Sequence, residues 1–288
     1  MALKTLTRSA RTQTYKPVPV TPPPGPVKRF VSAVVPPVIM GLLLIGLYAW
    51  VRSQLPPHRL FLMPSAQGLW EQAFSKPEVL QELWERSLVT ISIAVCGLAV
   101  SIPLGMAIGI VMFRFHVMER AVFPYLVALQ SIPILAIIPL IQSALGFGFL
   151  PKVLIVALFT FFAVPTTLLL GLKSQDPGIL NLFRLQGAGW RKMLWKAGLP
   201  SAAPALFAGF RISTSMAIIG AVTSELFFLA GKGGLGQMLI NAKTEFKYEQ
   251  MYAALIASSA LSIGIFLIFT WVGNLLFSSW HESASRRG

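Results

Sequence analysis

Gly187 lies in a polar, basic segment, residues 172–200, that interrupts an otherwise apolar sequence. The segment opens on Asp176-Pro177 and ends on Leu199-Pro200, twelve and thirteen residues after the glycine. Polar, basic and aromatic side chains fill it, among them Arg184, Gln186, Trp190 and Arg191. Long apolar runs flank it, so it connects two membrane spans and cannot itself be buried in lipid, where charged groups are costly. It must therefore meet water or a soluble partner. Gly187 suits either an ordinary turn in a loop between spans or a turn between two short helices, one of which inserts into a partner.

Four side chains of this segment have two open interpretations: Trp190, Arg191, Leu194 and Trp195. They suit anchors at the membrane interface, where tryptophan and arginine are common. They equally suit the contact surface of a protein partner, where aromatic residues and arginine dominate binding.

A second set of residues suggests a path through the membrane. Arg211 is the only charge deep inside an apolar run, and Glu225 lies fourteen residues later at the edge of the same run. About 21 Å of helix separates them, so they are not a direct pair. An intramembrane charge is a functional candidate by default, although each side chain has the alternative of reaching towards its nearer interface. Prolines six residues apart in another run predict a broken helix, which is tolerated only beside protein or water. The predicted path residues are Ser131, Pro133, Pro139, Arg211, Ser215 and Glu225.

Catalysis and cofactor binding have no support in the sequence. The three histidines are scattered, and no nucleophile set or cysteine cluster is present. The segment GKGGLGQ (231–237) lacks the order of a phosphate-binding loop, because its lysine precedes most of the glycines. We therefore expect a chain that is not an enzyme and holds no metal or cofactor of its own.

The composition predicts an all-α, polytopic membrane protein. Of 288 residues, 55% are hydrophobic and 12% charged, and the mean hydropathy is +0.70. Apolar runs long enough to span a bilayer occur at about 31–51, 88–113, 121–144, 150–172, 201–228 and 252–277. With the N-terminus inside, fifteen of the 24 Lys and Arg residues fall in inner segments and eight in outer ones. This asymmetry predicts that both termini are cytoplasmic. It also accounts for the net charge of +14, so nucleic-acid binding is not needed to explain it.

The predicted organisation has four parts. Residues 1–29 form a disordered, basic, Pro-rich cytoplasmic arm, and 30–87 hold the first span, expected to be an uncleaved anchor, and an outer amphipathic segment lying at the membrane interface. Residues 88–280 form the transmembrane core with the polar loop 173–200, and 281–288 a cytoplasmic tail.

Three stretches in order resemble permeases of the nitrate/sulfonate/taurine group of ABC importers. They are the Pro-rich run 132–148, which ends in Gly-Phe-Gly, the segment 176–211, and SELFFLAGKGGLGQ (224–237). In the second stretch, the spacing from Gly187 to Leu199-Pro200 is similar to that of the family's ATPase-coupling loop. One departure is that Asn181-Leu182-Phe183 stands where the family has Glu-Ala-Ala. This departure leaves two alternatives, a divergent ATPase partner or reduced coupling.

The resemblance implies a type I ABC importer permease with about six spans in the bacterial plasma membrane. It implies a homodimer, a dimeric cytoplasmic ATPase that binds ATP and Mg, and an extracytoplasmic solute-binding protein. The ATPase contact would involve Asp176, Arg184, Gln186, Gly187, Trp190, Arg191, Leu199 and Pro200, and the binding protein would dock at Lys232, Gly233, Gly234 and Gly236. The solute would be small and polar: an oxyanion, an organosulfonate or a small heterocycle. The alternative, a secondary transporter or channel working without ATP, predicts paired charges near the midplane, and the sequence has only Arg211 there.

Overall fold

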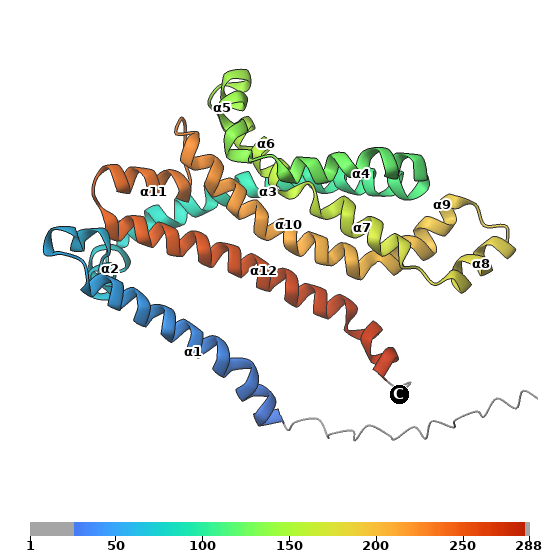
Figure 1. Ribbon diagram of the computed structural model, residues 1–288, viewed down its shortest axis with the longest axis horizontal. Coiled ribbons are helices and arrows are strands. Elements are labelled where there is room, and N and C mark those ends of the chain that lie inside the picture. The colour runs from blue at the N-terminus through green and yellow to red at the C-terminus, as the bar shows by residue number, and fades with distance from the viewer. Residues whose placement is uncertain (1–25, 286–288) are drawn as a thin grey trace, which may run out of the picture. The chain divides into compact units, whose positions relative to one another are not determined.

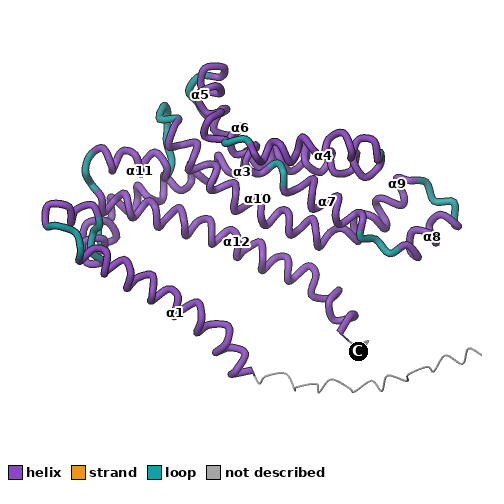
Figure 2. Tube along the Cα trace, in the orientation of Figure 1, coloured by secondary structure: helices purple, strands orange, loops and turns teal. Residues whose placement is uncertain are grey.

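The computed structural model describes the backbone of residues 26–285, and every regular element in that range is a helix (Figures 1 and 2). The predicted all-α class is confirmed. The chain divides into two compact units, residues 1–60 and 61–288. Most of the predicted arm 1–29, and residues 286–288 of the predicted tail, lie outside the described residues.

The first unit contains one long helix, α1 (Pro26–Ser53), and the start of a short 3₁₀ helix, η1 (Pro57–Leu62). The part of α1 from Val34 to Ser53 has a mean hydropathy of 2.1. At about 1.5 Å per residue its 20 residues reach across a hydrocarbon core of about 30 Å. This helix corresponds to the first predicted span.

The second unit contains the other helices in a bundle. They are α2 (Ala66–Leu69), the π-helical turn η2 (Trp70–Phe74), α3 (Pro77–Arg114), α4 (His116–Ser131), α5 (Ile134–Leu145), α6 (Phe149–Thr160), α7 (Ala163–Lys173), α8 (Pro177–Leu185), α9 (Trp190–Met193), the π-helical turn η3 (Leu194–Gly198), α10 (Leu199–Phe227), α11 (Leu235–Thr244) and α12 (Tyr248–Ser285). In this bundle α10 is the central helix, and it packs against α3, α6, α7 and α12.

Five stretches of the described chain are long and apolar enough to cross a membrane, and a bent pair of helices makes a sixth. The bent pair is α4 and α5, which meet at 95°. The break falls at Ile132-Pro133, where the proline ring restricts the preceding residue and removes a helix hydrogen bond. The count of about six spans and the predicted break are both confirmed.

The structure refines two predicted boundaries and confirms a third. The last part of the predicted outer amphipathic segment is not a separate interfacial helix, because α3 runs unbroken from Pro77 to Arg114. The fifth span, predicted at 201–228, continues a helical stretch that begins at Trp190. The predicted fourth span, 150–172, is confirmed as the stretch Phe149–Lys173, in which α6 and α7 are joined through helical backbone at Phe161-Phe162.

A stripe of small residues lets α3 approach α6 and α7 closely. Its members recur every fourth residue: Gly97, Ser101, Gly105 and Gly109, all buried. A Cβ at Gly105 would lie 2.9 Å from Val164 Cβ, and Thr160 Oγ1 donates a 2.7 Å hydrogen bond to Ser101 Oγ. Close backbone approach gives van der Waals packing and interhelical hydrogen bonds, the main forces between helices in lipid.

Gly105→Leu is therefore expected to destabilise the bundle. The larger side chain has no room beside Val164, so α3 must separate from α7, and the apparent melting temperature should fall by about 5–10 °C. Thermal unfolding of the purified protein in detergent measures the shift. Val100→Leu, which adds volume at an exposed site on the same helix, is the matched control. An equal shift in both variants would contradict close packing at Gly105.

Candidate coupling and translocation sites

The predicted docking segment folds as two short helices around Gly187. Asp176 begins α8, and its side chain accepts a 2.7 Å hydrogen bond from the backbone N–H of Gly178. Asp176 is therefore the N-cap of this helix. Gly187 has φ +64°, in the left-handed region that favours glycine. It joins α8 to α9 in an exposed turn, and a Cβ built at this position would have no neighbour within 4 Å.

The base of this two-helix segment is anchored in the bundle. Leu194 is buried in a cluster with Leu172 and Leu206, and Trp190 packs partly against it. The Arg114 guanidinium, at the end of α3, lies 5.4 Å from the ring centroid of Trp190. Leu194 is thus a core residue, and neither of its two predicted interpretations applies. Trp195 is 69% exposed and keeps both interpretations.

The outer side of α8 presents an unpartnered apolar ridge. Ile179, Leu182 and Leu185 follow one another at three-residue spacing, and Leu185 is 86% exposed. Leu182 belongs to the Asn-Leu-Phe sequence that departs from the family pattern. The departure therefore places an apolar side chain on the exposed surface of α8.

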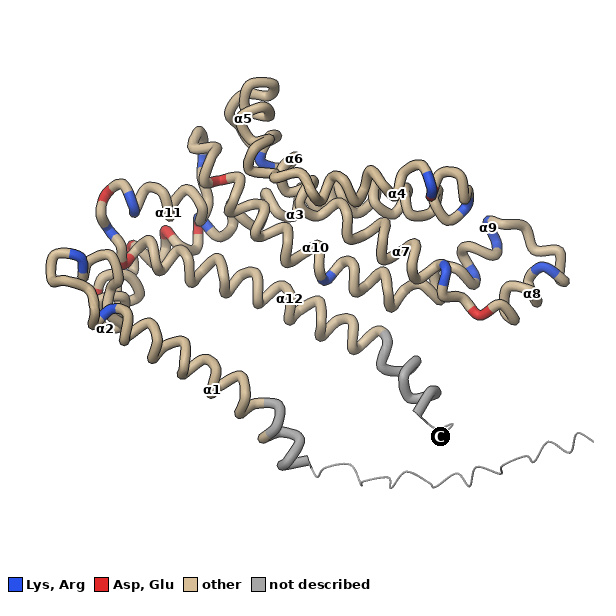
Figure 3. The backbone as a smooth tube through the Cα atoms, in the orientation of Figure 1, with Lys and Arg blue, Asp and Glu red and all other residues tan. Residues whose placement is uncertain are grey.

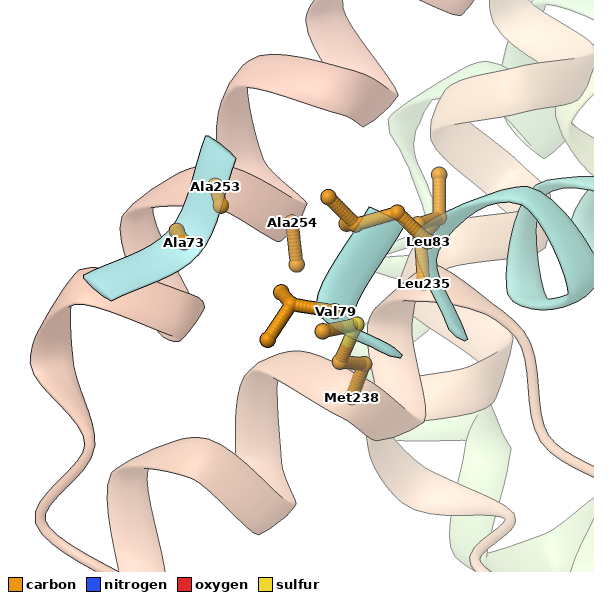
Figure 4. Packing of buried hydrophobic residues seen from close by; sticks show 7 residues of the cluster. All are labelled: Ala73, Val79, Leu83, Leu235, Met238, Ala253 and Ala254. Carbon is orange, nitrogen blue, oxygen red and sulfur yellow. The ribbon is translucent and has the colours of Figure 1, made fainter. Parts of the chain in front are cut away.

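The opposite end of the bundle is formed by the predicted outer segments. Figure 4 shows Ala73 of η2, Val79 and Leu83 of α3, Leu235 and Met238 of α11, and Ala253 and Ala254 of α12 in one buried cluster. In Figure 1, α2 and α11 lie at one end of the long axis and α8 and α9 at the other. The predicted outer and inner segments therefore lie at opposite ends.

The Gly-rich loop at this outer end borders two cavities. Lys232 and Gly233 line one of about 620 Å³ together with Glu82, Glu85 and Arg86 of α3. Lys232 also lines one of about 260 Å³ with Phe147 and Lys152. Gly233, Gly234 and Gly236 are buried, so within one protomer Lys232 is the predicted docking residue that is exposed to a partner.

Arg211 is placed halfway along α10 with little to neutralise it. Its Cζ atom lies 5.0 Å from the ring centroid of Phe266 on α12, and its buried Nε has no hydrogen-bond partner among the residues that the structure describes. None of the four ion pairs found among the described side chains includes it. Figure 3 shows how the charged residues otherwise gather towards the two ends of the bundle. Ser215 lies one turn further on, and its hydroxyl donates to the Arg211 carbonyl at 3.4 Å.

The structure places Glu225 elsewhere than predicted. Its side chain is fully enclosed within one protomer, at 0% exposure, and its carboxylate is hydrogen-bonded to Thr90 and to the backbone of Gly236. A side chain with no exposed surface does not line a path, so the prediction for Glu225 was wrong. Sequence reasoning also missed Lys152, which is only 2% exposed in α6 and interacts electrostatically with Glu225. The sequence feature that could have identified it is a lone lysine at the start of an apolar run.

The other predicted path residues lie apart from Arg211 within one protomer. Ser131, Pro133 and Pro139 are exposed around the α4–α5 elbow, which packs on α3 and α6. Beneath the elbow is a largely apolar cavity of about 290 Å³ that Gln130 and Phe159 help to line. The elbow touches α10 near its end, where Gln142 Nε2 donates to the Phe227 carbonyl at 2.9 Å.

Residues 101–282 match the family described as "binding-protein-dependent transport system inner membrane component". The chain belongs to this family. It is therefore a multi-pass inner-membrane permease subunit of an ATP-driven importer, and it forms the translocation path for a solute that a binding protein delivers.

Curated relatives of this permease cover most of its length. It is 30% identical to the formylaminopyrimidine transport permease protein ThiX of Halalkalibacterium halodurans, over 87% of this chain and 97% of the relative. It is 30% identical to the riboflavin transport system permease protein RibX of Chloroflexus aurantiacus, over 86% of this chain and 90% of the relative. It is 29% identical to the putative aliphatic sulfonates transport permease protein SsuC of Bacillus subtilis, over 61% and 63%.

A solved structure supports the fold of the permease. The match is to a chain from the inward-facing MetNI methionine ABC transporter, at a TM-score of 0.54 and 17% sequence identity. It covers 75% of this chain and 99% of that chain. The predicted architecture of an ABC importer permease is confirmed.

Proposed function

We propose that the permease works as a homodimer whose two α8–α9 segments dock on a cytoplasmic ATPase dimer. The observation that supports this is the exposed turn at Gly187, with φ +64°, between two short helices whose base is buried in the bundle. A turn held in this way moves as one piece with α7 and α10. ATP-driven closure of the ATPases would then switch the permease between inward-open and outward-open states. ATP and Mg would be bound by the ATPase, and this chain would hold no cofactor.

We place the α8–α9 end in the cytoplasm and the α2–α11 end outside the cell. The excess of Lys and Arg in the predicted inner segments supports this orientation, with both termini inside. The binding protein would then meet the end that carries the exposed Lys232. Gly233, Gly234 and Gly236 would shape the loop from within.

The path between these ends would run beside α10. This helix is central in the bundle, yet it leaves Ile212, Met216 and Ile219 exposed in one stripe next to Ser215. A second copy of the permease facing this stripe would enclose a path that includes Arg211.

The solute would be small and polar, as in the nitrate/sulfonate/taurine group. The names of the relatives, which refer to a formylaminopyrimidine, riboflavin and aliphatic sulfonates, support this breadth. Specificity would then lie mainly in the binding protein.

Thiol labelling in intact cells tests the orientation on which the proposal rests. In a Cys96→Ala background, a cysteine at Gln67 or Asn241 should react with a membrane-impermeant reagent, and one at Gln186 should react only after the cells are opened. All three positions are exposed. Labelling of Gln186 from outside would reverse the orientation and remove the ATPase contact.

A further inference from the structure

The start of α11 is capped by side chains from two other helices. The first backbone N–H groups of a helix have no partner within it and need one elsewhere. Here the Leu235 N–H donates to Thr90 Oγ1 at 2.9 Å, and the Gly236 N–H donates to Glu225 Oε2 at 2.8 Å. Thr90 belongs to α3 and Glu225 to α10, so three helices meet at these two backbone groups.

Thr90 and Glu225 are also bonded to each other. The threonine hydroxyl lies 3.0 and 3.1 Å from the two carboxylate oxygens, and both side chains are fully buried. A carboxylate at a helix N-terminus interacts favourably with the helix dipole, and it accepts charge-assisted hydrogen bonds from the backbone N–H groups there. Lys152 of α6 is also buried and interacts electrostatically with Glu225, without forming one of the direct ion pairs among the described side chains.

Two glycines of the loop make this approach possible. A Cβ at Gly234 would lie 2.2 Å from both Glu225 Oε1 and Thr90 Oγ1, and one at Gly236 would lie 2.3 Å from the Val222 carbonyl. Arg86 adds a further tie, since its Nη1 donates to the Gly233 carbonyl at 2.9 Å. Close contact with Glu225 and its surroundings therefore explains the glycines at 234 and 236.

The loop thus has an exposed end at Lys232 and a buried end at Gly236. A displacement of the exposed end is connected to α3 and α10 through the hydrogen bonds from the loop backbone to Thr90 and Glu225. The helix α10 is the one that carries Arg211 and the exposed stripe. The same hydrogen bonds that cap α11 therefore connect the outer surface to the proposed path.

We infer that Thr90 and Glu225 form a latch that positions the Gly-rich loop for the binding protein and transmits its arrival to α3 and α10. The inference rests on the proposed function in one respect, the docking of the binding protein at this loop. Thr90 and Glu225 touch neither solute nor partner; they are positioning residues that act through the backbone of residues 233–236.

The latch is tested on the complete transporter in lipid nanodiscs, with the binding protein that co-purifies with it and the solute that this protein carries. Thr90→Val keeps the shape of the side chain but leaves the Leu235 N–H without an acceptor. Amide exchange at Leu235 and Gly236 should rise about tenfold or more. The binding-protein concentration that gives half-maximal ATPase stimulation should rise about tenfold because the loop is no longer positioned, and the stimulated rate at saturation should fall several-fold because the loop is no longer tied to α3 and α10.

Two further variants separate the hydroxyl from general packing. Thr90→Ser retains the hydroxyl and should restore wild-type amide exchange and wild-type ATPase stimulation. Ser224→Ala is the matched control, because this buried hydroxyl bonds only to the Ala221 carbonyl of its own helix. Unchanged exchange in Thr90→Val, or a Thr90→Ser variant as defective as Thr90→Val, overturns the latch.

Glu225→Gln keeps the test decisive if Thr90→Val fails to assemble. The amide oxygen accepts more weakly than the carboxylate, so exchange at Gly236 should still rise several-fold, and no rise overturns the latch. The exchange measurement also separates this inference from the proposed function. A binding protein that fails to stimulate the wild-type ATPase contradicts the proposed function, whereas the exchange of residues 235–236 still decides whether the latch exists.

Discussion

Gly187→Val is expected to reduce ATP-driven uptake about tenfold or more while the permease still inserts and folds. The backbone at this position has φ +64°, a conformation that a β-branched residue adopts only with strain of about 1–2 kcal/mol. The turn would open to relieve that strain, and α8 would leave its position relative to α9. The ATPase would then lose part of its contact with α8 and α9, or its closure would no longer move the permease helices correctly. Uptake into proteoliposomes and co-purification of the ATPase with the variant measure the two effects.

Gly189→Val is the matched control for this substitution. Gly189 is two residues further along the same exposed loop, and a Cβ there also meets nothing within 4 Å. Its φ of −64° suits any side chain. The two variants thus add the same atoms to the same surface and differ in backbone strain. Equal uptake in both would show that the left-handed turn is not required.

Gly187→Asn separates strain from bulk at the turn. Asparagine tolerates the left-handed conformation better than other non-glycine residues. Loss of uptake in Gly187→Asn as severe as in Gly187→Val would mean that the ATPase cleft excludes any side chain here. Near-normal uptake would assign the effect to backbone conformation. Either result retains a role for Gly187, and only normal uptake in both variants contradicts the docking surface.

Ser215→Trp is expected to abolish uptake while leaving ATPase docking intact. Ser215 lies next to the exposed stripe of α10 and one turn from Arg211. An indole there would project into the space that a second permease encloses, and it would fill a path sized for a small solute. Uptake should fall to less than about 5% of wild type, because a blocked path has no alternative route. The measurement is solute uptake normalised to the assembled complex.

The control for Ser215→Trp must be exposed but distant from the path. Leu104→Trp on α3 meets this need, since Leu104 is half exposed and lies on a different helix. Ala217→Trp, on α10 itself, would be an unsuitable control, because Ala217 is fully buried against α3 and α6. A tryptophan at Ala217 would disrupt the core and abolish uptake for an unrelated reason. Uptake that is equal for Ser215→Trp and Leu104→Trp, at equal expression, would remove α10 from the path.

Local patterns in the sequence were enough to predict the helical spans and the docking segment. Runs of apolar residues set the number and approximate ends of the spans, because helices that cross lipid must satisfy their backbone groups internally. Pro133 fixed the break between α4 and α5, and Gly187 fixed the turn between α8 and α9. These features depend on one residue and its immediate neighbours, so they can be read without knowing the fold.

Only the tertiary structure decided which side of each span is enclosed. Thr90 and Glu225 are 135 residues apart in sequence, yet they share a hydrogen bond. Both Arg211 and Glu225 were predicted to line the path, but α3 and α11 cover the glutamate and leave the arginine partly exposed. Gly105 and Ala217 became core residues for the same reason. Every side of a membrane helix is apolar enough to face lipid, so hydropathy carries no information about which side packs; that depends on close fits between small residues on separate helices.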